Sequence, residues 1–401
     1  MNMPPPRVSY AEIARLFLRI SLSSFGGPAA HLALGEDEIV TRRGWLSREH
    51  YLDLIAATNL IPGPNSTEVM IHVGYVLRGI PGALVSGFCF IFPAFLLTLA
   101  LSVVYVTTGT LPAIASILWG IQPAIIAIIA VAAYRLMPTA LKTRLLWGMF
   151  VVSITALVLT DIPEVTVMLG IGALYALLQI RPTPSATALF GIAPALSQFT
   201  LAAQTVIEGA RVGAFDLFFY FLRIGSVLFG SGYVLIAYIE QDLVANWGWL
   251  SARELLDAVA IGQFTPGPVL TTVTAVGYIT AGFPGAIMAT LGVFLPSFVL
   301  VILTAPLIPR MRQNRLLSAF LTGINSAVVA AILVTVLNLA LQAVRPLSGA
   351  EGVDVTSILS IGLFGATLVG ILRWKINATW LILFGATVGL IVGVLLPVSP
   401  V

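Results

Sequence analysis

Charged side chains are scarce in this chain of 401 residues. Aspartate, glutamate, lysine and arginine make up 9% of it, whereas soluble proteins contain roughly 25%. Hydrophobic residues make up 58%, and the mean hydropathy is +1.02. A soluble globular protein is excluded, because so much apolar surface cannot be hidden in a core of this size. A disordered chain is excluded too, because such chains are polar and charged.

Cysteine and histidine are also nearly missing. Cys89 is the only cysteine, so neither an internal disulfide nor a cysteine-built metal cluster can form. The three histidines (His31, His50 and His72) are too few for a histidine-rich metal site, although mixed ligation stays open. We therefore predict no metal site and no cofactor.

Motifs of enzymes and of ATP-driven pumps are missing as well. The chain has no phosphate-binding P-loop, no Gly-x-Ser-x-Gly and no His-Glu-x-x-His. Its basic residues do not cluster with aromatic residues, as nucleic-acid binding requires. We therefore expect neither an enzyme nor a nucleic-acid partner.

Long apolar stretches are what the chain has instead. At ~20 apolar residues per span, there is room for about ten membrane spans, and the ~10-residue alternating segments of a membrane β-barrel are not seen. We predict an all-α polytopic membrane protein in a lipid bilayer. The continuous apolar stretches lie at about 81–106, 112–134, 145–160, 165–180, 284–308, 315–338, 355–372 and 377–397.

The chain contains two copies of one unit. Residues 17–64 and 221–268 are identical at 19 of 48 positions, and the matches include arginine, glutamate, aspartate, tryptophan and proline. Chance similarity between apolar sequences gives leucine and valine matches instead. We predict two homologous repeats, 1–200 and 201–401, joined by a linker at about 181–213.

Matched loops differ in their number of basic residues, and the half with more of them changes from one pair of loops to another. Three arginines lie in 36–50 but only one in the equivalent 240–254, whereas 309–315 holds three and the equivalent 106–112 holds none. Positive charge favours the cytoplasmic side. The reversal predicts repeats inserted in opposite orientations, as in many secondary transporters.

Two proline- and glycine-rich sequences interrupt the apolar segments of each repeat. Proline lacks an N–H and disfavours a helical conformation in the residue before it, so a Pro-Gly-Pro ends one helix and can start another. We predict broken or re-entrant helices at 50–78 and 254–281. Helix N-termini exposed at such breaks suit an anion. The resulting candidate anion-binding residues are Gly26, Gly27, Pro28, Pro62, Gly63, Pro64, Asn65, Ser66, Gly230, Pro266, Gly267 and Pro268.

Two arginines, Arg19 and Arg223, occupy matched positions in apolar helices. A buried arginine is costly in lipid, so we expect both to face the interior, where a guanidinium could bind an oxyanion. A structural carboxylate partner, or a position at the lipid headgroups, is the alternative interpretation.

Four further residues are candidates for proton coupling: Asp53, Glu68, His72 and Asp257. Glu68 and His72 are one helical turn apart, and a carboxylate beside a histidine in a membrane could relay a proton. Asp53 and Asp257 match across the repeat, and each could instead stabilise a helix start.

Several other polar residues have a plainer interpretation. The matched Gln122 and Asn325 could be ligands, but hydrogen bonding between helices is the commoner role, and we expect it here. His31 has an apolar counterpart, Leu235, which weakens a symmetric role. Solvated loops are expected for the carboxylates Glu36, Glu38, Glu240 and Asp242.

Three segments together resemble the chromate ion transporter family in its long-chain, two-domain form. They are Phe25–His31, Arg42–Leu46 and Ile61–Glu68, and the resemblance covers roughly 10–180 and 214–400. It implies a carrier in the inner (cytoplasmic) membrane that exports chromate and confers chromate resistance, with halves of opposite orientation. The chain departs from the family pattern at Ser231-Gly232, where the motif has Gly-Pro, and at Asn59.

The sequence thus predicts a secondary transporter of chromate, a tetrahedral divalent oxyanion, driven by membrane potential, protons or both. An inside-negative potential favours anion export, by ~2.3 kcal/mol per charge per 100 mV. The alternatives are a permease for sulfate or another oxyanion and, less favoured, an intramembrane enzyme. Sulfate is a second candidate ion, and a homodimer is a candidate assembly.

Overall fold

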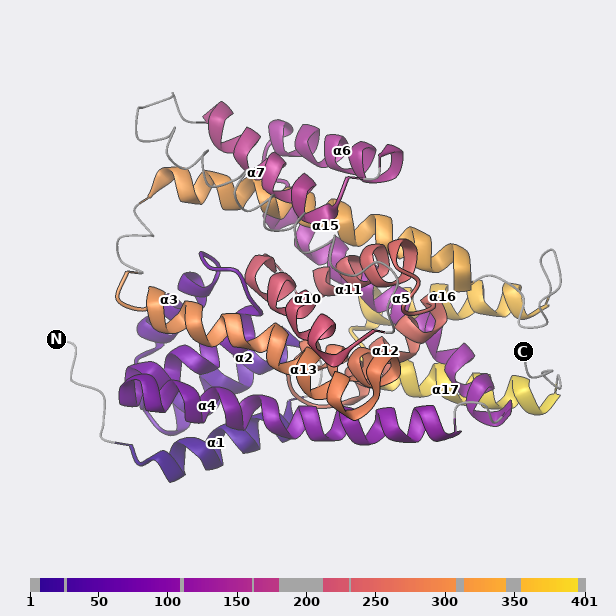
Figure 1. Cartoon of the computed structure of the whole chain (residues 1–401), viewed down its shortest axis with the longest axis horizontal. Coiled ribbons are helices and arrows are strands. Elements are labelled where there is room, and N and C mark those ends of the chain that lie inside the picture. The colour runs from indigo at the N-terminus through magenta and orange to yellow at the C-terminus, as the bar shows by residue number, and fades with distance from the viewer. Residues whose placement is uncertain are drawn as a thin grey trace.

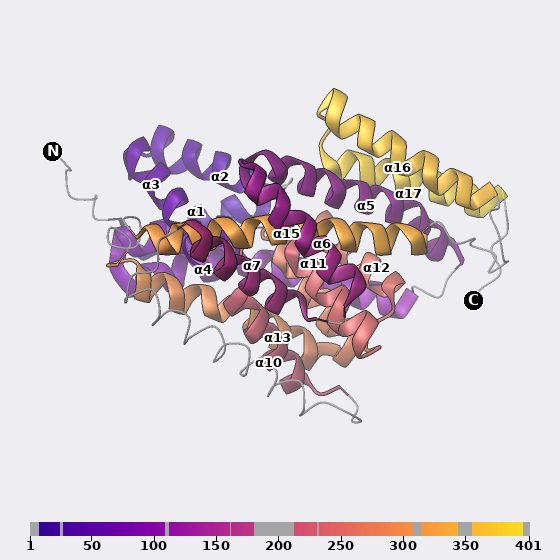
Figure 2. The same ribbon diagram turned by 90° about the horizontal axis from the view of Figure 1, so that it is seen from above.

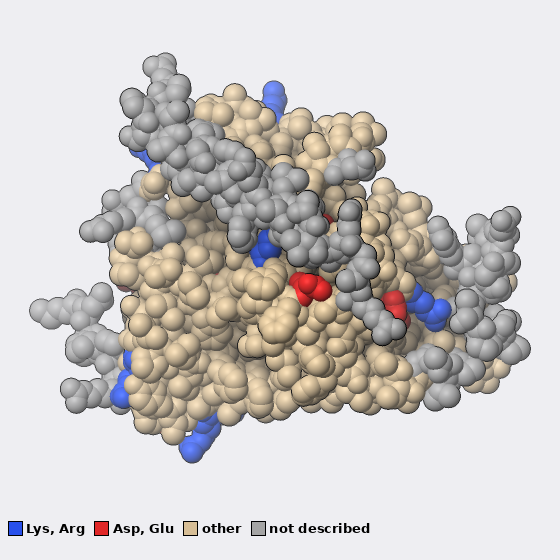
Figure 3. All heavy atoms as spheres, viewed as in Figure 1, with Lys and Arg blue, Asp and Glu red and all other residues tan. Residues whose placement is uncertain are grey.

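The computed structural model describes residues 8–24, 27–108, 112–160, 162–179, 212–230, 232–307, 314–343 and 355–395. Every regular element in these ranges is a helix, which confirms the all-α prediction. Six of these helices are long and apolar enough to cross a membrane, and two shorter ones are apolar. The face drawn in Figure 3 carries few charged side chains. The chain is therefore a multi-pass membrane protein, while the number of about ten spans stays a prediction.

The first half begins with α1 (Tyr10–Ser23), which starts at a capping box formed by Ser9 and Glu12. A short helix α2 (Pro28–Glu36) then runs directly into the π-helix η1 (Asp37–Arg42). After these come the helices α3 (Arg48–Thr58), α4 (Asn65–Thr108), α5 (Pro112–Ala140), α6 (Arg144–Leu159) and α7 (Glu164–Gln179).

The second half repeats this order. Its elements are α10 (Ala214–Val227), α11 (Val234–Ile239), the π-helix η2 (Glu240–Asn246), α12 (Ala252–Phe264), the short 3₁₀-helix η3 (Val269–Thr271), α13 (Thr272–Thr304), α15 (Arg315–Ala343), α16 (Val355–Trp374) and α17 (Ala378–Leu395). Except for residues 212 and 213, the predicted linker lies outside the described residues.

The helices break where the proline-rich motifs predict. In the first half, α3 ends at Thr58 and α4 begins at Asn65, directly after Pro62-Gly63-Pro64. In the second half, Pro266-Gly267-Pro268 separates α12 from η3 in the same way. Whether these segments re-enter the membrane stays a prediction.

Both α4 and α13 contain a second break, at equivalent positions. Arg78 and Gly79 have φ/ψ of −145°/22° and 65°/−153°, and Ala281 and Gly282 have −138°/23° and 64°/−155°. The glycines adopt a backbone conformation that other residues rarely take. Each long element is therefore two helices joined at a sharp kink.

The last two helices of each half pack against a helix of the other half. Helix α5 packs against α16 and α17 of the second half, and α15 packs against α6 and α7 of the first half. Glycines allow the closest approaches: Gly120 meets Gly385 between α5 and α17, and Gly323 meets Gly172 between α15 and α7. Figures 1 and 2 show α1, α2 and α3 towards one end of the long axis, and α16 and α17 towards the other.

Candidate functional site

The two Pro-Gly-Pro loops each bind the backbone of the opposite half. The amide of Gly63 donates a hydrogen bond to the carbonyl of Leu228 at 2.6 Å, and the amide of Gly267 donates to that of Ser24 at 3.1 Å. Leu228 and Ser24 are the residues at which α10 and α1 end. The breaks of both halves therefore meet at one crossing, which we call the loop crossing.

Glycine is required at the centre of each loop. Gly63 has a φ of 141°, and a Cβ placed there would lie 2.0 Å from Glu68 Oε1 and 3.0 Å from Ser297 Oγ. At Gly267, a Cβ would lie 2.7 Å from the Cβ of Ala94. No larger side chain fits without displacing these neighbours, so the loops are held in direct contact with α4 and α13.

Two helices of the first half begin at this crossing. Pro28 is the first residue of α2, with Gly27 as its N-cap at a φ of 81°, and α4 begins directly after Pro64. The first amides of a helix have no partner within the helix and carry a partial positive charge. The crossing therefore presents N–H groups of a kind that binds anions.

His31 and Ser66 connect these two helices. His31 Nδ1 lies 3.1 Å from Ser66 Oγ, and its ring packs edge-on against Phe90 at a centroid distance of 5.3 Å. Both side chains are buried. His31 is a residue whose role the sequence undervalued, because its partner lies 35 residues away and its counterpart in the second half is apolar.

Several buried polar side chains from five helices near the crossing have an atom without a hydrogen-bond partner among the described residues. Buried polar groups in proteins are nearly always satisfied, so such a concentration points to a missing partner, such as a ligand, a proton or water. Both carboxylate oxygens of Glu68 are in this condition, in a side chain that is 0% exposed. The others are Ser21 Oγ, His31 Nε2, Thr67 Oγ1, His72 Nε2, Gln263 Nε2 and Ser297 Oγ.

The expectation that both arginines face the interior is wrong for Arg19. Its side chain is 63% exposed and lies 3.8 Å from Glu38, on the side of α1 opposite the residues that pack inward. Arg223 is buried, but its guanidinium pairs with Asp242 at 2.6 Å. The structural-partner interpretation therefore describes Arg223, and neither arginine presents an unpaired guanidinium at the loop crossing.

The segments that we expected to be solvated loops form the π-helices η1 and η2. Glu38, Glu240 and Asp242 on them are buried, and Glu36 is half-buried, which corrects that expectation. The reason is the ion pairing of Glu38 and Asp242 with the arginines of α1 and α10.

The matched aspartates have different environments. Asp257 is buried and accepts hydrogen bonds from Tyr105 at 3.0 Å and Gln122 at 3.1 Å, both from the first half. Asp53 is exposed on α3. The interhelical hydrogen bond expected for Gln122 is thereby confirmed. Helices α3 and α12 start instead at serine N-caps, Ser47 and Ser251.

Near the loop crossing, the remaining motif residues make local contacts. Asn65 Nδ2 donates to Asn59 Oδ1 at 2.7 Å. Gly230 has a φ of 85° and lies against Asn325, whose Oδ1 would be 3.1 Å from a Cβ at that position. Gly26 lies outside the described residues.

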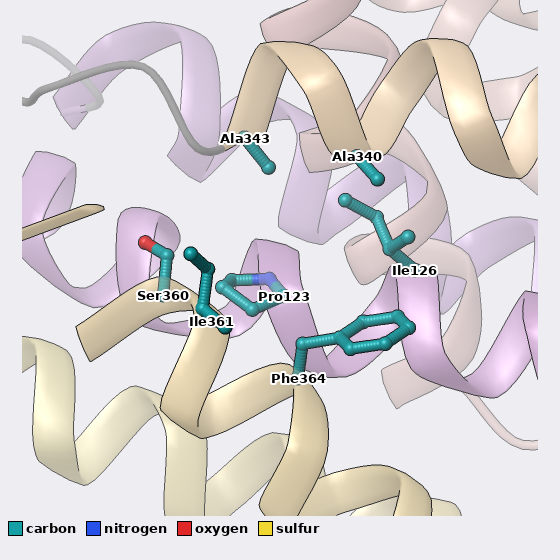
Figure 4. A pocket seen from close by; sticks show the side chains of 7 residues that line it. All are labelled: Pro123, Ile126, Ala340, Ala343, Ser360, Ile361 and Phe364. Atoms are coloured by element: carbon teal, nitrogen blue, oxygen red, sulfur yellow. The ribbon is translucent and has the colours of Figure 1, made fainter. Parts of the chain in front are cut away.

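A separate cavity of about 90 Å³ lies between α5, α15 and α16. Figure 4 shows its lining, in which Ser360 is the only polar side chain among Pro123, Ile126, Ala340, Ala343, Ile361 and Phe364. This lining carries no charge and no histidine, so the cavity is unsuited to an anion and is not the candidate site.

A family model for chromate transporters matches the chain at residues 11–177 and 215–390. The chain belongs to the chromate transporter family. It is 30% identical to chromate transport proteins of Cupriavidus metallidurans (96% of this chain and 94% of that one) and Pseudomonas aeruginosa (97% and 94%). It is 31% identical to a probable chromate transport protein of Synechococcus elongatus (85% and 87%). No solved structure matches the chain. As a member of this family it is a transporter rather than an enzyme.

Proposed function

We propose that this protein is a secondary transporter that exports chromate across the cytoplasmic membrane, with the ion bound at the loop crossing. The buried polar atoms without partners at that crossing carry the proposal. The names of the full-length relatives in Cupriavidus metallidurans and Pseudomonas aeruginosa support the choice of ion.

Neutral donors bind the ion in this proposal. A tetrahedral dianion accepts several hydrogen bonds, and the first amides of α2 and α4 supply some of them. Ser297 adds a side-chain donor, and the bonded pair of His31 and Ser66 adds one more, from whichever member does not use its proton in their mutual bond. Such donors suit transport because they bind a dianion without an opposite charge that would retain it.

Glu68 makes the site sensitive to protons. Its carboxyl group lies beside Gly63 in the same crossing, and a second negative charge there would repel the bound dianion. Glu68 therefore holds a proton while chromate is bound. With that proton, one net negative charge moves outward instead of two, which the potential favours by about 2.3 rather than about 4.6 kcal/mol per 100 mV. Export stays downhill along the electrical gradient in both cases.

The two halves act as inverted repeats that occupy different positions. We call α2–η1–α3 and its equivalent α11–η2–α12 the hairpins of the first and second half. The second hairpin is mostly buried, with α12 against α13 of its own half and also against α5 and α4 of the first. The first lies partly at the surface, with α3 packed mainly on α4. This difference supports alternating access, in which each hairpin in turn closes over the crossing.

The sequence repeat predicts one contact of the opposite state, in which the first hairpin is buried and the second is open. Asp257 and Gln122 are bonded in this structure. Their sequence equivalents are Asp53 and Asn325, of which Asp53 is exposed here and Asn325 lies beside Gly230. When the first hairpin closes and the second opens, Asp53 takes Asn325 as its partner.

Transport into inside-out vesicles tests the proposed function. Chromate should accumulate in the lumen when a lumen-positive potential is applied, and collapse of the potential should abolish the accumulation. Sulfate, added in excess, measures selectivity between two tetrahedral dianions. Accumulation of sulfate without chromate would make the protein a sulfate permease, and no potential-driven accumulation of either ion would exclude the proposal.

A further inference from the structure

A second buried group of charges lies away from the loop crossing, between α7 of the first half and α10 and η2 of the second. It contains three carboxylates and one guanidinium: Glu164, Glu240, Asp242 and Arg223. Each of the four residues is at most 7% exposed. We call it the acidic cluster.

The guanidinium of the acidic cluster neutralises only one carboxylate. Arg223 Nη2 binds Asp242 at 2.6 Å, while Arg223 Nε has no hydrogen-bond partner among the described residues. Within the described part of the chain, Glu240 receives only long contacts, of 3.4 and 3.5 Å, from the amide of Asn338. Glu164 Oε2 is buried and has no partner in the described chain.

The equivalent carboxylates of the first half have cations beside them. Glu38 lies within 3.8 Å of Arg19, Arg42 and Arg43, and Glu36 binds Arg48 at 2.8 Å. Three of these arginines are replaced in the second half, whose equivalent residues are Asn246, Trp247 and Ala252. The second half therefore buries the same carboxylates after losing most of their positive partners.

Burying an uncompensated carboxylate is costly, so such a group takes up a counter-charge or a proton. A metal ion is disfavoured, because the described residues hold no group of three or more histidine, cysteine, aspartate or glutamate side chains arranged to bind one. Among the residues that the structure describes, the remaining neighbours offer no further cation. They are the hydroxyls of Tyr220 and Tyr238, which donate to the Tyr238 carbonyl and to Met168 Sδ, and the amides of Gln241 and Asn338.

We propose that Glu164 and Glu240 form a proton-binding site in the second half, occupied while the second hairpin is buried. This coupling to the hairpin rests on the proposed function, whereas proton binding itself does not. Gln241 connects η2 to the start of α7: its Oε1 accepts from the Glu164 amide at 2.9 Å, and its Nε2 donates to the Ile162 carbonyl at 3.4 Å.

Opening of the second hairpin releases the proton. In the first half, Glu36 is half-buried, whereas its equivalent Glu240 is buried. Movement of η2 away from α7 breaks both Gln241 bonds and brings Glu240 into contact with water. Each transport cycle then binds and releases a proton at the acidic cluster, independently of Glu68.

Infrared spectroscopy of the purified, chromate-free protein tests the site directly. The carbonyl-stretch band of protonated carboxylic acids should be weaker at neutral pH in Glu164→Gln or Glu240→Gln than in the wild type. Glu49→Gln, on the exposed surface of α3, is the matched control and should leave the band unchanged. If neither cluster variant loses intensity in this band, the proposal is overturned.

Stability and transport provide independent readouts. Glutamine mimics the protonated acid, so Glu164→Gln should retain the thermal stability of the wild type, and a large loss of stability at every pH would show that an ionised carboxylate is needed. Transport by this variant should continue with a pH profile at least two-fold flatter than that of the wild type, and an unchanged profile would overturn the coupling. If the wild type moves no chromate, the proposed function fails while the infrared result still decides the site.

Discussion

The amide of Gly63 donates a hydrogen bond to the carbonyl oxygen of Leu228, 2.6 Å away in the other half of the chain. The equivalent pair, Gly267 and Ser24, makes the same bond in the reverse direction between the halves. These reciprocal bonds join each Pro-Gly-Pro loop to the end of α10 or α1 in the other half. Polar atoms gather there without partners among the described residues, so the crossing is the place where an ion can be bound and released.

Replacement of Gly63 by alanine should abolish transport. The added Cβ would lie 2.0 Å from Glu68 Oε1, and the φ of 141° is strained for any L-residue. Gly148→Ala is the matched control, because no atom lies within 4 Å of its Cβ position. Vesicle uptake and the amount of folded protein in the membrane should be measured together. Normal transport by Gly63→Ala would show that this loop does not shape the site.

The two matched arginines should differ in their effect on stability. Arg223→Gln leaves Asp242 buried without its partner and should destabilise the protein by about 3–5 kcal/mol. Arg19→Gln removes a mostly exposed contact and should cost about 0–1 kcal/mol. Unfolding in detergent, followed by circular dichroism, compares the two. Equal losses would contradict the structural assignment of Arg223, and a transport defect in a fully stable Arg19→Gln would return that residue to the binding site.

Substitutions in the first half should harm transport more than equivalent ones in the second. Ser66→Ala removes the partner of His31, and Glu68→Gln removes the proton-binding group. Thr271 and Thr272, after the second Pro-Gly-Pro, instead bond to nearby backbone carbonyls, so their alanine variants should transport nearly normally.

The pH dependence separates the two roles in the first half. Wild-type transport should fall as the pH rises, because deprotonated Glu68 repels the dianion. Glutamine stays neutral, so Glu68→Gln should flatten that part of the profile, while Ser66→Ala lowers transport at every pH. Equal tolerance of all four substitutions, with unchanged profiles, would show that the polar groups of the first half are structural.

Opposite orientation of the repeats can be tested by labelling. Cysteines introduced by Trp45→Cys and Trp249→Cys, each in a Cys89→Ser background, occupy equivalent positions in the two halves. An impermeant thiol reagent should label one of them in right-side-out vesicles and the other in inside-out vesicles. Labelling of both from the same side would exclude inverted repeats.

Local chemistry explains which features could be predicted from the sequence. Proline and glycine act on the backbone wherever they lie, so the breaks at 62–64 and 266–268 follow from the residues alone. The helix starts at Ser47 and Ser251 follow likewise, because the cap contacts a backbone amide three residues away.

Features that depend on packing could not be predicted in this way. Arg19 and Arg223 have the same sequence context, yet one is exposed and the other buried, because the first hairpin lies partly outside and the second inside. His31 and Ser66 meet only because the short helix α2 packs against the start of α4. Ser21, Gln263 and Ser297 are single polar residues whose shared location exists only in three dimensions.

Location of the bound ion tests the central claim most directly. Chromium scatters X-rays anomalously, so crystals of the protein soaked in or grown with chromate reveal its position. We expect a peak at the loop crossing, within hydrogen-bonding distance of Ser66 or His31 and beside Gly63. A peak beside Arg19 or Arg223, or in the apolar cavity next to Phe364, with none at the crossing, would contradict it.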